Sequence, residues 1–459
     1  MVGIILAAGK GTRMKSKLPK VLHTICGKPM GRFVIDACIE SGMERCVVVI
    51  GHGAEQVRDG LGEDVSYVIQ EQQLGTGDAC RQALPALGPD VEDVMVLPGD
   101  APLIQAETLA ALIREHEATG AAATVLTAVL PDAGSYGRII RAGDNSILGI
   151  VEAKDATPEQ RAVREINTGI YCFRLHLLQE ALSRITPANA QGEYYLTDVI
   201  ALLVQAGEKV CPVVSEETDV ILGVNDRADL AHLTAIIRAR VNRGLMLAGV
   251  TMTDPASTYV DTDVRVGPDT VIHPMTVLER GTVIGEGCTI GPSTRLVNSR
   301  IGDECVILAS NIVDTEMGHG CKVGPYSNLR PGTRLGNKVK IGDFVETKNA
   351  LIHDSVSLSH LSYIGDAEVG ERTNVGAGTI TCNYDGYKKS RTTIGKNVFL
   401  GSNTIMVAPV EIGDGSLTAA GSIITEDVPA DALAVARARQ VVKEDWARER
   451  REQMEKERE

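Results

Sequence analysis

The sequence predicts an α/β domain with a mostly parallel sheet, then a connecting helix, then a parallel β-helix of hexapeptide repeats. Strand-like apolar runs alternate with amphipathic helical patterns up to about residue 223, and beyond Val266 an aliphatic residue recurs at every sixth position. Aromatic residues make up only 3% of the chain and glycines number 47, which is typical of small, regular side chains filling a long stretch. The 459 residues exceed one ordinary core, so two or three domains are expected.

An apolar strand at the start of the chain leads into a glycine-rich loop. Residues 4–6 form the strand, and the small residues of 7–11 let backbone amides approach a ligand closely. Arg13 and Lys20 follow, a guanidinium that can bind two phosphate oxygens and an ammonium that adds a point charge. The third glycine of the dinucleotide fingerprint and the Gly-Lys-Ser/Thr of a P-loop are both absent from the loop sequence. The alternative is an ordinary strand-to-helix turn, but the two cations favour a nucleotide site.

The alternation of strands and helices continues to about residue 223. The expected strands are Cys46–Ile50, Tyr67–Ile69, Val94–Leu97, Thr124–Val129 and Gly169–Phe173, and the expected helices are Arg32–Ser41, Thr76–Leu84 and Ala106–His116. Ligands of such sheets bind beyond the carboxyl ends of the strands. The opening loop and residues 98–100 both fall at that edge.

A helical run over residues 224–248 is expected to connect the two main parts of the chain. Asn225 or Asp226 is the candidate N-cap, because a side-chain oxygen there can accept hydrogen bonds from the first backbone amides of the helix. The predicted domains are therefore 1–223 and 249–459, joined by this helix.

The hexapeptide pattern slips by one residue in places and then resumes. Its predicted inward positions are Val266, Ile272, Leu278, Ile284, Ile290, Leu296, Ile301, Ile307, Val323, Leu329, Leu335, Ile341, Ile394, Leu400, Met406 and Ile412. In a parallel β-helix each such residue points inward and stacks on the next coil. The polar and basic segment 381–391 interrupts the stack and is predicted to be a binding loop, while the charged segment 437–459 is predicted to be a solvated helix.

Charge and apolar content limit the possible functions. A net charge of −14 argues against general nucleic-acid binding and leaves only local basic pockets for phosphates. The apolar N-terminus is too short for a signal peptide or a membrane span, and no later run reaches about 18 apolar residues. The 10 cysteines lack the spacing of a zinc or redox motif. We therefore expect a cytoplasmic protein with no nucleic-acid partner and no membrane insertion.

Six motifs in both halves of the chain point to one known family. They are LAAGKGTRM (6–14), LPKVLH (18–23), QLGTG (73–77), VEAKDA (151–156), EINTG (165–169) and NVGAGTITCNYDG (374–386). Over essentially its whole length the chain resembles the bifunctional N-acetylglucosamine-1-phosphate uridylyltransferase / glucosamine-1-phosphate N-acetyltransferase family of bacteria. The resemblance implies a Rossmann-like nucleotidyltransferase domain, a long linker helix and a left-handed β-helix. It also implies the product UDP-N-acetylglucosamine, a precursor of peptidoglycan and lipopolysaccharide.

By this resemblance the N-terminal domain transfers UMP from UTP to N-acetylglucosamine 1-phosphate and releases pyrophosphate. Arg13 and Lys20 match the catalytic cations of the family, and Asp100 and Asn225 match its Mg²⁺ ligands. The positions that match contacts to UTP or UDP-N-acetylglucosamine are Leu6, Ala7, Ala8, Gly9, Lys20, Gln70, Gly75, Thr76, Gly99, Gly137, Glu152, Asn167, Thr168 and Asn225. Taken alone, Asp100 is as readily a turn residue and Asn225 a helix cap. Pro98 departs from the family pattern, in which Tyr or Ser is expected.

By the same resemblance the C-terminal domain acetylates glucosamine 1-phosphate with acetyl-CoA. A protonated amine is not a nucleophile, so the reaction needs a general base, and His360 matches that base. Arg330, Lys348, Tyr363 and Asn374 match the residues that hold glucosamine 1-phosphate, and Ala377, Asn383, Tyr384, Ser402, Ala420 and Arg437 match the acetyl-CoA site. Taken singly, each is an ordinary residue of a β-helix edge.

The family implies a homotrimer with the acetyl-transfer sites between subunits, where Asn383 and Lys389 reach a neighbouring chain. Two alternatives remain open. One is a single-activity sugar-1-phosphate nucleotidyltransferase whose β-helix serves regulation or assembly, and the other is a scaffold that senses a nucleotide without catalysis. The joint presence of His360 and the matched sugar-phosphate residues counts against the first alternative.

Overall fold

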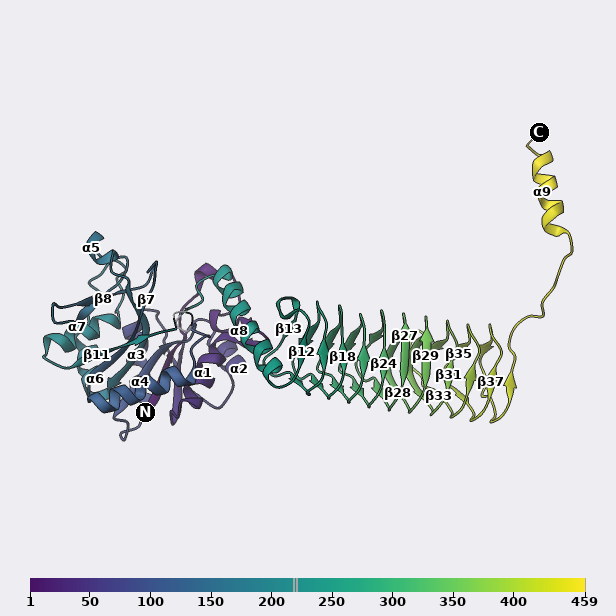
Figure 1. Cartoon of the computed structure of the whole chain (residues 1–459), viewed down its shortest axis with the longest axis horizontal. Helices are drawn as coiled ribbons and strands as arrows, with labels where there is room; N and C mark the ends of the chain where they lie inside the picture. Colours follow the sequence, from purple (N-terminus) through teal and green to yellow (C-terminus); the bar gives the residue numbers. More distant parts are fainter. Residues whose placement is uncertain (218, 220–221, 459) are drawn as a thin grey trace. The chain divides into compact units, whose positions relative to one another are not determined.

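The structure is a computed structural model that describes residues 1–217, 219 and 222–458 (Figure 1). It divides into two compact units, Met1–Val241 and Asn242–Glu459, so the division falls within the long helix α8 (Arg227–Leu247). The first unit is an α/β domain and the second is a left-handed parallel β-helix. The fold class predicted from the sequence is confirmed.

A mixed sheet with one reversed strand forms the centre of the first unit. Its strands follow the order β11 (Val210–Ser215), β7 (Ala123–Val129), β10 (Glu165–Arg174), β6 (Asp93–Pro98), β1 (Val2–Leu6), β4 (Arg45–Ile50) and β5 (Ser66–Ile69). Only β10 runs antiparallel to its neighbours along this path of described strands. The antiparallel pair β8 (Arg138–Arg141) and β9 (Ile147–Val151) joins the sheet beside β10 and was not predicted. All six predicted strands are present, including the one predicted at residues 4–6, and each begins one or more residues earlier than predicted.

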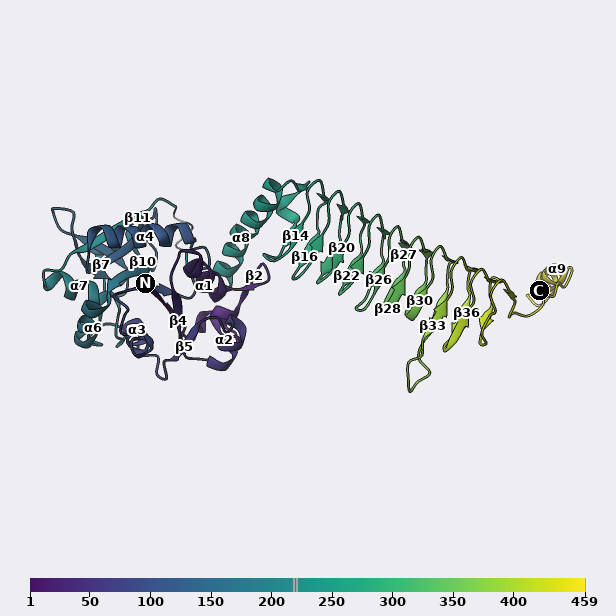
Figure 2. The same ribbon diagram turned by 90° about the horizontal axis from the view of Figure 1, so that it is seen from below.

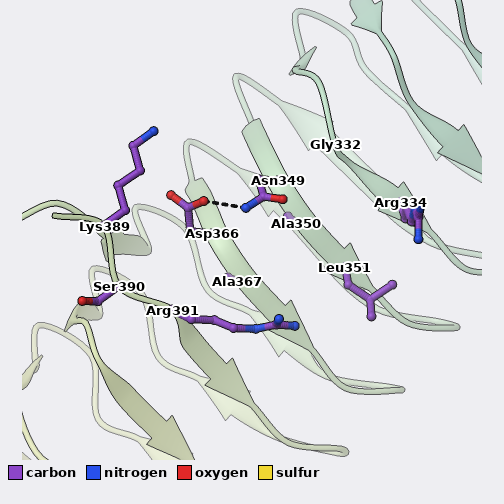
Figure 3. A pocket seen from close by; sticks show the side chains of 10 residues that line it. All are labelled: Gly332, Arg334, Asn349, Ala350, Leu351, Asp366, Ala367, Lys389, Ser390 and Arg391. Carbon is purple, nitrogen blue, oxygen red and sulfur yellow. Dashed lines mark hydrogen bonds between the residues drawn. The ribbon is translucent and has the colours of Figure 1, made fainter.

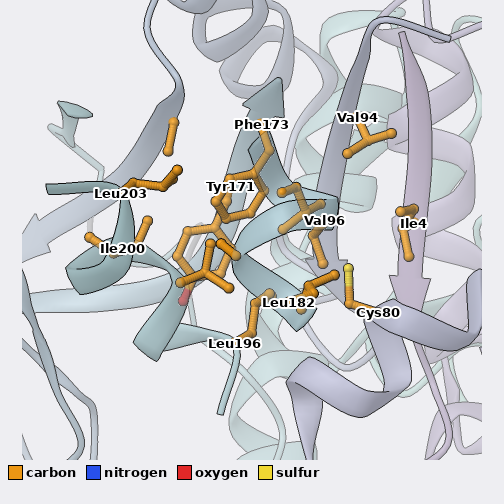
Figure 4. Packing of buried hydrophobic residues seen from close by; sticks show 14 of the residues in the cluster. Ile4, Cys80, Val94, Val96, Tyr171, Phe173, Leu182, Leu196, Ile200 and Leu203 are labelled. Atoms are coloured by element: carbon orange, nitrogen blue, oxygen red, sulfur yellow. The ribbon is translucent and has the colours of Figure 1, made fainter. Parts of the chain in front are cut away.

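Helices cover both faces of this sheet, which explains the continuous apolar run at the start of the chain. The described helices of eight or more residues that lie wholly within the first unit are α1 (Met30–Glu40), α2 (Ala54–Leu61), α3 (Thr76–Ala83), α4 (Ala106–Thr119), α6 (Leu175–Arg184) and α7 (Thr197–Gln205). Neighbouring residues of β1 enter different cores, because successive side chains of a strand point to opposite faces. Ile4 packs in the cluster with Tyr171 and Leu182 (Figure 4), whereas Ile5 packs in the cluster that contains Val48.

Asp226 caps the start of α8. Its Oδ1 accepts hydrogen bonds from the backbone amides of Ala228 at 2.8 Å and Asp229 at 3.0 Å. Asn225, the other candidate, uses its side chain elsewhere, because its Oδ1 accepts from Arg13. Of the two predicted caps, the structure therefore selects Asp226.

The second unit is a stack of coils whose strands pair in parallel with the coils before and after (Figures 1 and 2). One sheet consists of β12 (Thr251–Met252), β15 (Val271–Ile272), β18 (Thr289–Ile290), β21 (Val306–Ile307), β24 (Lys322–Val323), β27 (Lys340–Asp343), β29 (Ser357–His360), β31 (Asn374–Val375), β34 (Phe399–Leu400), β37 (Leu417–Thr418) and β39 (Leu433–Ala434). The other runs from β13 (Tyr259–Val260) to β38 (Ile423–Ile424) and includes β25 (Asn328–Leu329), β28 (Glu346–Ile352), β30 (Tyr363–Val369), β32 (Ile380–Cys382) and β33 (Thr392–Ile394).

The predicted inward residues form the core of this stack. All of them are buried except Val266, which is half-buried. Val266 belongs to the first coil, where β14 (Arg265–Val266) pairs along the stack with β17 (Val283–Ile284) of the following coil. The C-terminal helix α9 (Trp446–Lys456) has no buried residue among those described, as expected for a solvated helix.

Candidate active sites

A cavity of about 380 Å³ opens at the carboxyl edge of the first sheet. Nine of the predicted nucleotide-site residues line it: Leu6, Ala8, Gly9, Gln70, Gly75, Thr76, Asp100, Glu152 and Asn167. They come from the ends of β1, β5, β6 and β9, from β10 and from the start of α3. Residues that are far apart in the sequence thus converge where ligands of such sheets bind.

A second cavity of about 220 Å³ adjoins the first and shares Leu6, Gly9 and Asp100 with it. The predicted residues Ala7, Arg13, Lys20 and Asn225 line this second cavity. Gly11 makes the loop geometry possible, because its φ is +57° and a Cβ there would lie 2.9 Å from the Cβ of Lys20. A larger residue at position 11 would push the Lys20 side chain away from the loop.

Each predicted cation of the second cavity is paired with a predicted metal ligand. Lys20 Nζ forms an ion pair with the Asp100 carboxylate, and Arg13 Nη2 donates to Asn225 Oδ1 at 2.8 Å. Mg²⁺ needs only one or two protein oxygens, because water and substrate phosphates complete its octahedral shell. The described residues contain no group of three or more His, Cys, Asp or Glu arranged to hold a metal. Asp100 and Asn225 fit Mg²⁺ held jointly with a phosphate.

The larger cavity also contains the half-buried carboxylate of Glu152. Thr197 Oγ1 donates to Glu152 Oε1 at 3.2 Å, and burial raises the pKa of Glu152. Beside it, Asn167 Nδ2 donates to Tyr171 Oη at 2.7 Å. A Cβ at Gly137 would lie 3.5 Å from Glu152 and from Asn167, so the absence of a side chain keeps this space open. The arrangement offers a carboxylate acceptor and a fixed amide to a polar ligand.

Three predicted residues line neither cavity. Gly99 donates its backbone N–H to Leu6 O at 2.9 Å, and Gly137 lies behind the Glu152 side chain. Thr168 is buried and donates its hydroxyl to Leu126 O at 2.7 Å, so it is turned into the sheet. These positions support the cavity wall.

Eight residues that line the larger cavity were not predicted from the sequence: Gln73, Ala79, Pro98, Gly169, Tyr171, Glu193, Leu196 and Thr197. The segment containing Glu193 reaches the site because the backbone of Tyr194 bonds to both Leu74 and Gly77. Gly75 permits this approach, since its φ is +115° and a Cβ there would lie 2.6 Å from Tyr194 O. The close approach of the Tyr194 backbone therefore requires a glycine at position 75. No local sequence pattern near residues 193–197 predicts that this segment packs against residues 74–77.

Four predicted residues of the second unit form one row along the stack. His360, Ala377, Ser402 and Ala420 each lie two residues beyond paired positions of β29, β31, β34 and β37. Backbone hydrogen bonds tie the row together, because the carbonyls of His360, Ala377 and Ser402 accept from the following coil. At about 4.8 Å between coils the row spans about 14 Å, with His360 at one end and small residues beyond it.

Arg330 and Lys348 lie side by side on neighbouring coils, each one residue beyond the paired positions of β25 and β28. Together with Lys389 they form a cluster of three cations. Arg330 Nη1 donates to Glu346 Oε1 at 2.7 Å, which raises the pKa of Arg330. The neighbouring Lys389 ammonium lowers the pKa of Lys348, and Arg330 adds to this effect. The phenol of Tyr363 lies over Gly365, the residue paired with Lys348. Cations this close to one another favour a bound anion such as a phosphate.

Residues 381–391, the segment predicted to be a binding loop, form a hairpin that contributes Lys389 to the cation cluster (Figure 2). Tyr384 pairs with Lys389 across it, and Asn383 donates its side-chain amide to Asp366. A cavity of about 540 Å³ lies next to the loop, and Figure 3 shows Lys389 and Asp366 on its wall. His360 does not line it.

The remaining predicted residues of the second unit lie on exposed surface. Asn374 is an exposed residue of β31, paired with positions in β29 and β34. Tyr384 is 60% exposed, and Arg437 is exposed just beyond the last coil. The residues matched to glucosamine 1-phosphate and acetyl-CoA thus share one region of the stack without forming one enclosed pocket.

An α/β unit with a candidate nucleotide site, followed by a β-helix with a second candidate site, is the architecture of a two-part transferase, and the family models agree with this class. Residues 3–140 match the family model of the MobA-like NTP transferase domain, and residues 263–298 match that of the bacterial transferase hexapeptide. Residues 391–426 match the hexapeptide repeat of succinyl-transferase.

The chain is also similar over nearly its whole length to named bacterial proteins. It is 50% identical to the bifunctional protein GlmU of Brevibacillus brevis, over 97% of this chain and 96% of that protein. It is 52% identical to the bifunctional protein GlmU of Pelotomaculum thermopropionicum, over 98% of this chain and 99% of that protein. The chain belongs to the family of bifunctional GlmU proteins, and the predicted pair of activities, sugar-1-phosphate uridylyl transfer and glucosamine-1-phosphate N-acetyl transfer, is confirmed.

The family also identifies nucleotide and acetyl-CoA substrates. In the described part of the chain, no helix is both long enough and apolar enough to cross a membrane.

Proposed function

We propose that residues 1–223 carry uridylyl transfer at the two adjoining cavities, and that residues 249–459 carry acetyl transfer on the β-helix. The convergence of Arg13, Lys20, Asp100 and Asn225 in one cavity carries the first assignment. The sugar phosphate attacks the α-phosphorus of UTP, the bond to the pyrophosphate oxygen breaks, and pyrophosphate leaves. Arg13 and Lys20 stabilise the charge on the phosphate oxygens, and Glu152 and Asn167 hold the sugar.

Mg²⁺ is the proposed cofactor of uridylyl transfer, with Asp100 and Asn225 as its protein ligands. When bound, it neutralises phosphate charge at this point. The ion pair of Lys20 with Asp100 supports the assignment, because it places the Asp100 carboxylate in the same cavity as the cations proposed to bind the phosphates.

In acetyl transfer, His360 is the proposed general base. It accepts a proton from the amine of glucosamine 1-phosphate as the nitrogen attacks the thioester carbonyl, and the CoA thiolate leaves. Arg330, Lys348 and Tyr363 bind the phosphate, with Asn374 beside the sugar. The row that continues from His360 through Ala377, Ser402 and Ala420 provides a narrow surface for acetyl-CoA, while Asn383, Tyr384 and Arg437 contact it from the loop and the tail.

A homotrimer is the proposed assembly, with each acetyl-transfer site completed by a neighbouring subunit. Two observations support this: the matched residues lie on an open surface, and an apolar row lies next to His360. Tyr326 and Phe344 stack with their ring centroids 5.4 Å apart while 62% and 59% exposed, and Leu361 is 63% exposed. Exposed apolar residues in such a row favour contact with another chain. Because its substrates UTP and acetyl-CoA are cytoplasmic metabolites, we place the enzyme in the cytoplasm.

The assignment is tested with purified chain, glucosamine 1-phosphate, acetyl-CoA, UTP and Mg²⁺. We expect UDP-N-acetylglucosamine by mass spectrometry, with thiol and pyrophosphate released in equal amounts. Addition of EDTA should stop pyrophosphate release and leave thiol release unchanged. Thiol release that also stopped would contradict the assignment of Mg²⁺ to the first unit alone, and a product-free reaction would favour a scaffold.

A further inference from the structure

Gln70 lies in the wall of the larger nucleotide cavity with its side-chain amide fixed in one orientation. The residue is only 3% exposed, and its Nε2 donates to Asp78 Oδ2 at 2.7 Å and to Gly75 O at 3.2 Å. An ionised carboxylate and a carbonyl oxygen can only accept hydrogen bonds. The amide nitrogen of Gln70 therefore has to face them, and the opposite orientation would place oxygen against oxygen.

The fixed orientation makes Gln70 a pure acceptor toward the cavity. Both N–H groups of Nε2 are engaged, and the backbone N–H of Gln70 donates to Ile50 O at 2.7 Å. Within the described residues no donor bonds to Gln70 Oε1. An acceptor at such a point binds the N–H of a ligand and rejects a ligand that presents a lone pair there, because two buried acceptors would face each other.

Asp78 imposes this orientation from outside the cavity. Its side chain is 6% exposed and does not line the cavity, and it lies in the first turn of α3. Asp78 Oδ1 also accepts from Gln82 Nε2 at 3.3 Å, so a neighbouring turn of α3 fixes the carboxylate itself.

We propose that Asp78 is a positioning residue that sets the nucleobase specificity of the uridylyl-transfer site by holding the Gln70 amide oxygen toward the base. A pyrimidine with an N–H at ring position 3, such as uracil, donates to Gln70 Oε1. A pyrimidine with a lone pair at that position, such as cytosine, is rejected. The inference rests on the proposed function of the first unit and adds to it a residue that does not touch the substrate.

The test compares kcat/KM for UTP and CTP, with N-acetylglucosamine 1-phosphate as acceptor. In Asp78→Asn the new amide can donate, so Gln70 is free to turn its nitrogen toward the base. We expect the UTP:CTP ratio of kcat/KM to fall at least about tenfold in Asp78→Asn, and also in Asp78→Ala. Gln82→Ala, which removes only the other partner of Asp78, is the matched control and should keep the ratio within about twofold.

A double-mutant cycle separates this role from a structural one. In the Gln70→Ala background the ratio is already lost, so adding Asp78→Asn should not change it further. If Asp78→Asn lowered kcat/KM equally for UTP and CTP and so left their ratio unchanged, the proposal would be overturned. A further fall of the UTP:CTP ratio in the double variant would overturn it as well. Thiol release from acetyl-CoA and the unfolding temperature check that each variant is folded. If the wild-type chain released no pyrophosphate from UTP, the proposed function itself would fail, which is a distinguishable result.

Discussion

At the scale of single residues, Glu152 links the chemistry of the site to stability. Burial raises its pKa, so the folded protein binds this proton more tightly than the unfolded chain does. Folding is therefore favoured at low pH, and stability is lost as the pH rises from the ordinary carboxyl pKa through the raised value. Glu152→Gln removes this titration. We expect the variant to unfold at a higher temperature than the wild type at pH 7.5, by differential scanning calorimetry of the first unit.

The pH dependence provides the control for this prediction. As the pH is lowered toward 4, wild-type Glu152 becomes protonated and the two unfolding temperatures should approach each other. A difference that stayed constant between pH 7.5 and pH 4 would contradict the role of the charge. Weaker binding of N-acetylglucosamine 1-phosphate by the variant at pH 7.5 is expected as well, since Glu152 is a proposed sugar contact.

Residue-level prediction from sequence agrees with the structure where a motif lies at the end of a strand, because the sheet then fixes the position of the backbone. Gln70, Asp100 and Glu152 lie at strand ends, and the sheet brings them together in one cavity. Asp78 was not predicted because its role depends on which atoms of Gln70 face it. Thr168 belongs to the EINTG motif, yet its hydroxyl turns into the sheet to bond Leu126 O. Side-chain direction of this kind does not follow from spacing.

At the scale of elements, the inward residues of the coils stabilise the β-helix. Ile290 in β18 is fully buried between the paired strands β15 and β21, whereas its neighbour Thr289 points outward and is half-buried. We expect Ile290→Ala to destabilise the second unit by about 2–5 kcal/mol, measured by urea denaturation with circular dichroism. Thr289→Ala, the matched control, should change stability by only about 0.5 kcal/mol. Equal effects of the two changes would contradict the inward register.

The sequence predicted the elements of the two units unequally well. The hexapeptide period identified the inward residues of every coil it covered, because each coil repeats the same packing and errors of phase are quickly visible. In the first unit, strands β8, β9 and β11 were not predicted. β8 is only four residues long with arginine at both ends, so it has no clear apolar run, whereas β9 (ILGIV) is apolar and was overlooked. The choice between Asn225 and Asp226 as N-cap also needed coordinates, because both side chains can cap and only the Arg13 contact distinguishes them.

At the scale of the whole molecule, the central claim is that one chain carries two independent active sites. The proposed sites use different residues in units that are separately compact, and the two sets of proposed catalytic groups share no residue. Removal of a group from one site should therefore leave the other reaction intact. Sequence alone supported this division through motifs in each half, while the assembly of the β-helices depends on surfaces that motifs do not describe.

The most direct measurement records thiol release and pyrophosphate release separately for His360→Ala and Arg13→Ala, each reaction being supplied with its own substrates. The account predicts that His360→Ala lowers thiol release about 10²–10⁴-fold and leaves pyrophosphate release within about twofold. Arg13→Ala should do the reverse, with pyrophosphate release lowered about 10²–10³-fold. The loss of both activities through either single change, in a protein that remains folded, would contradict the account.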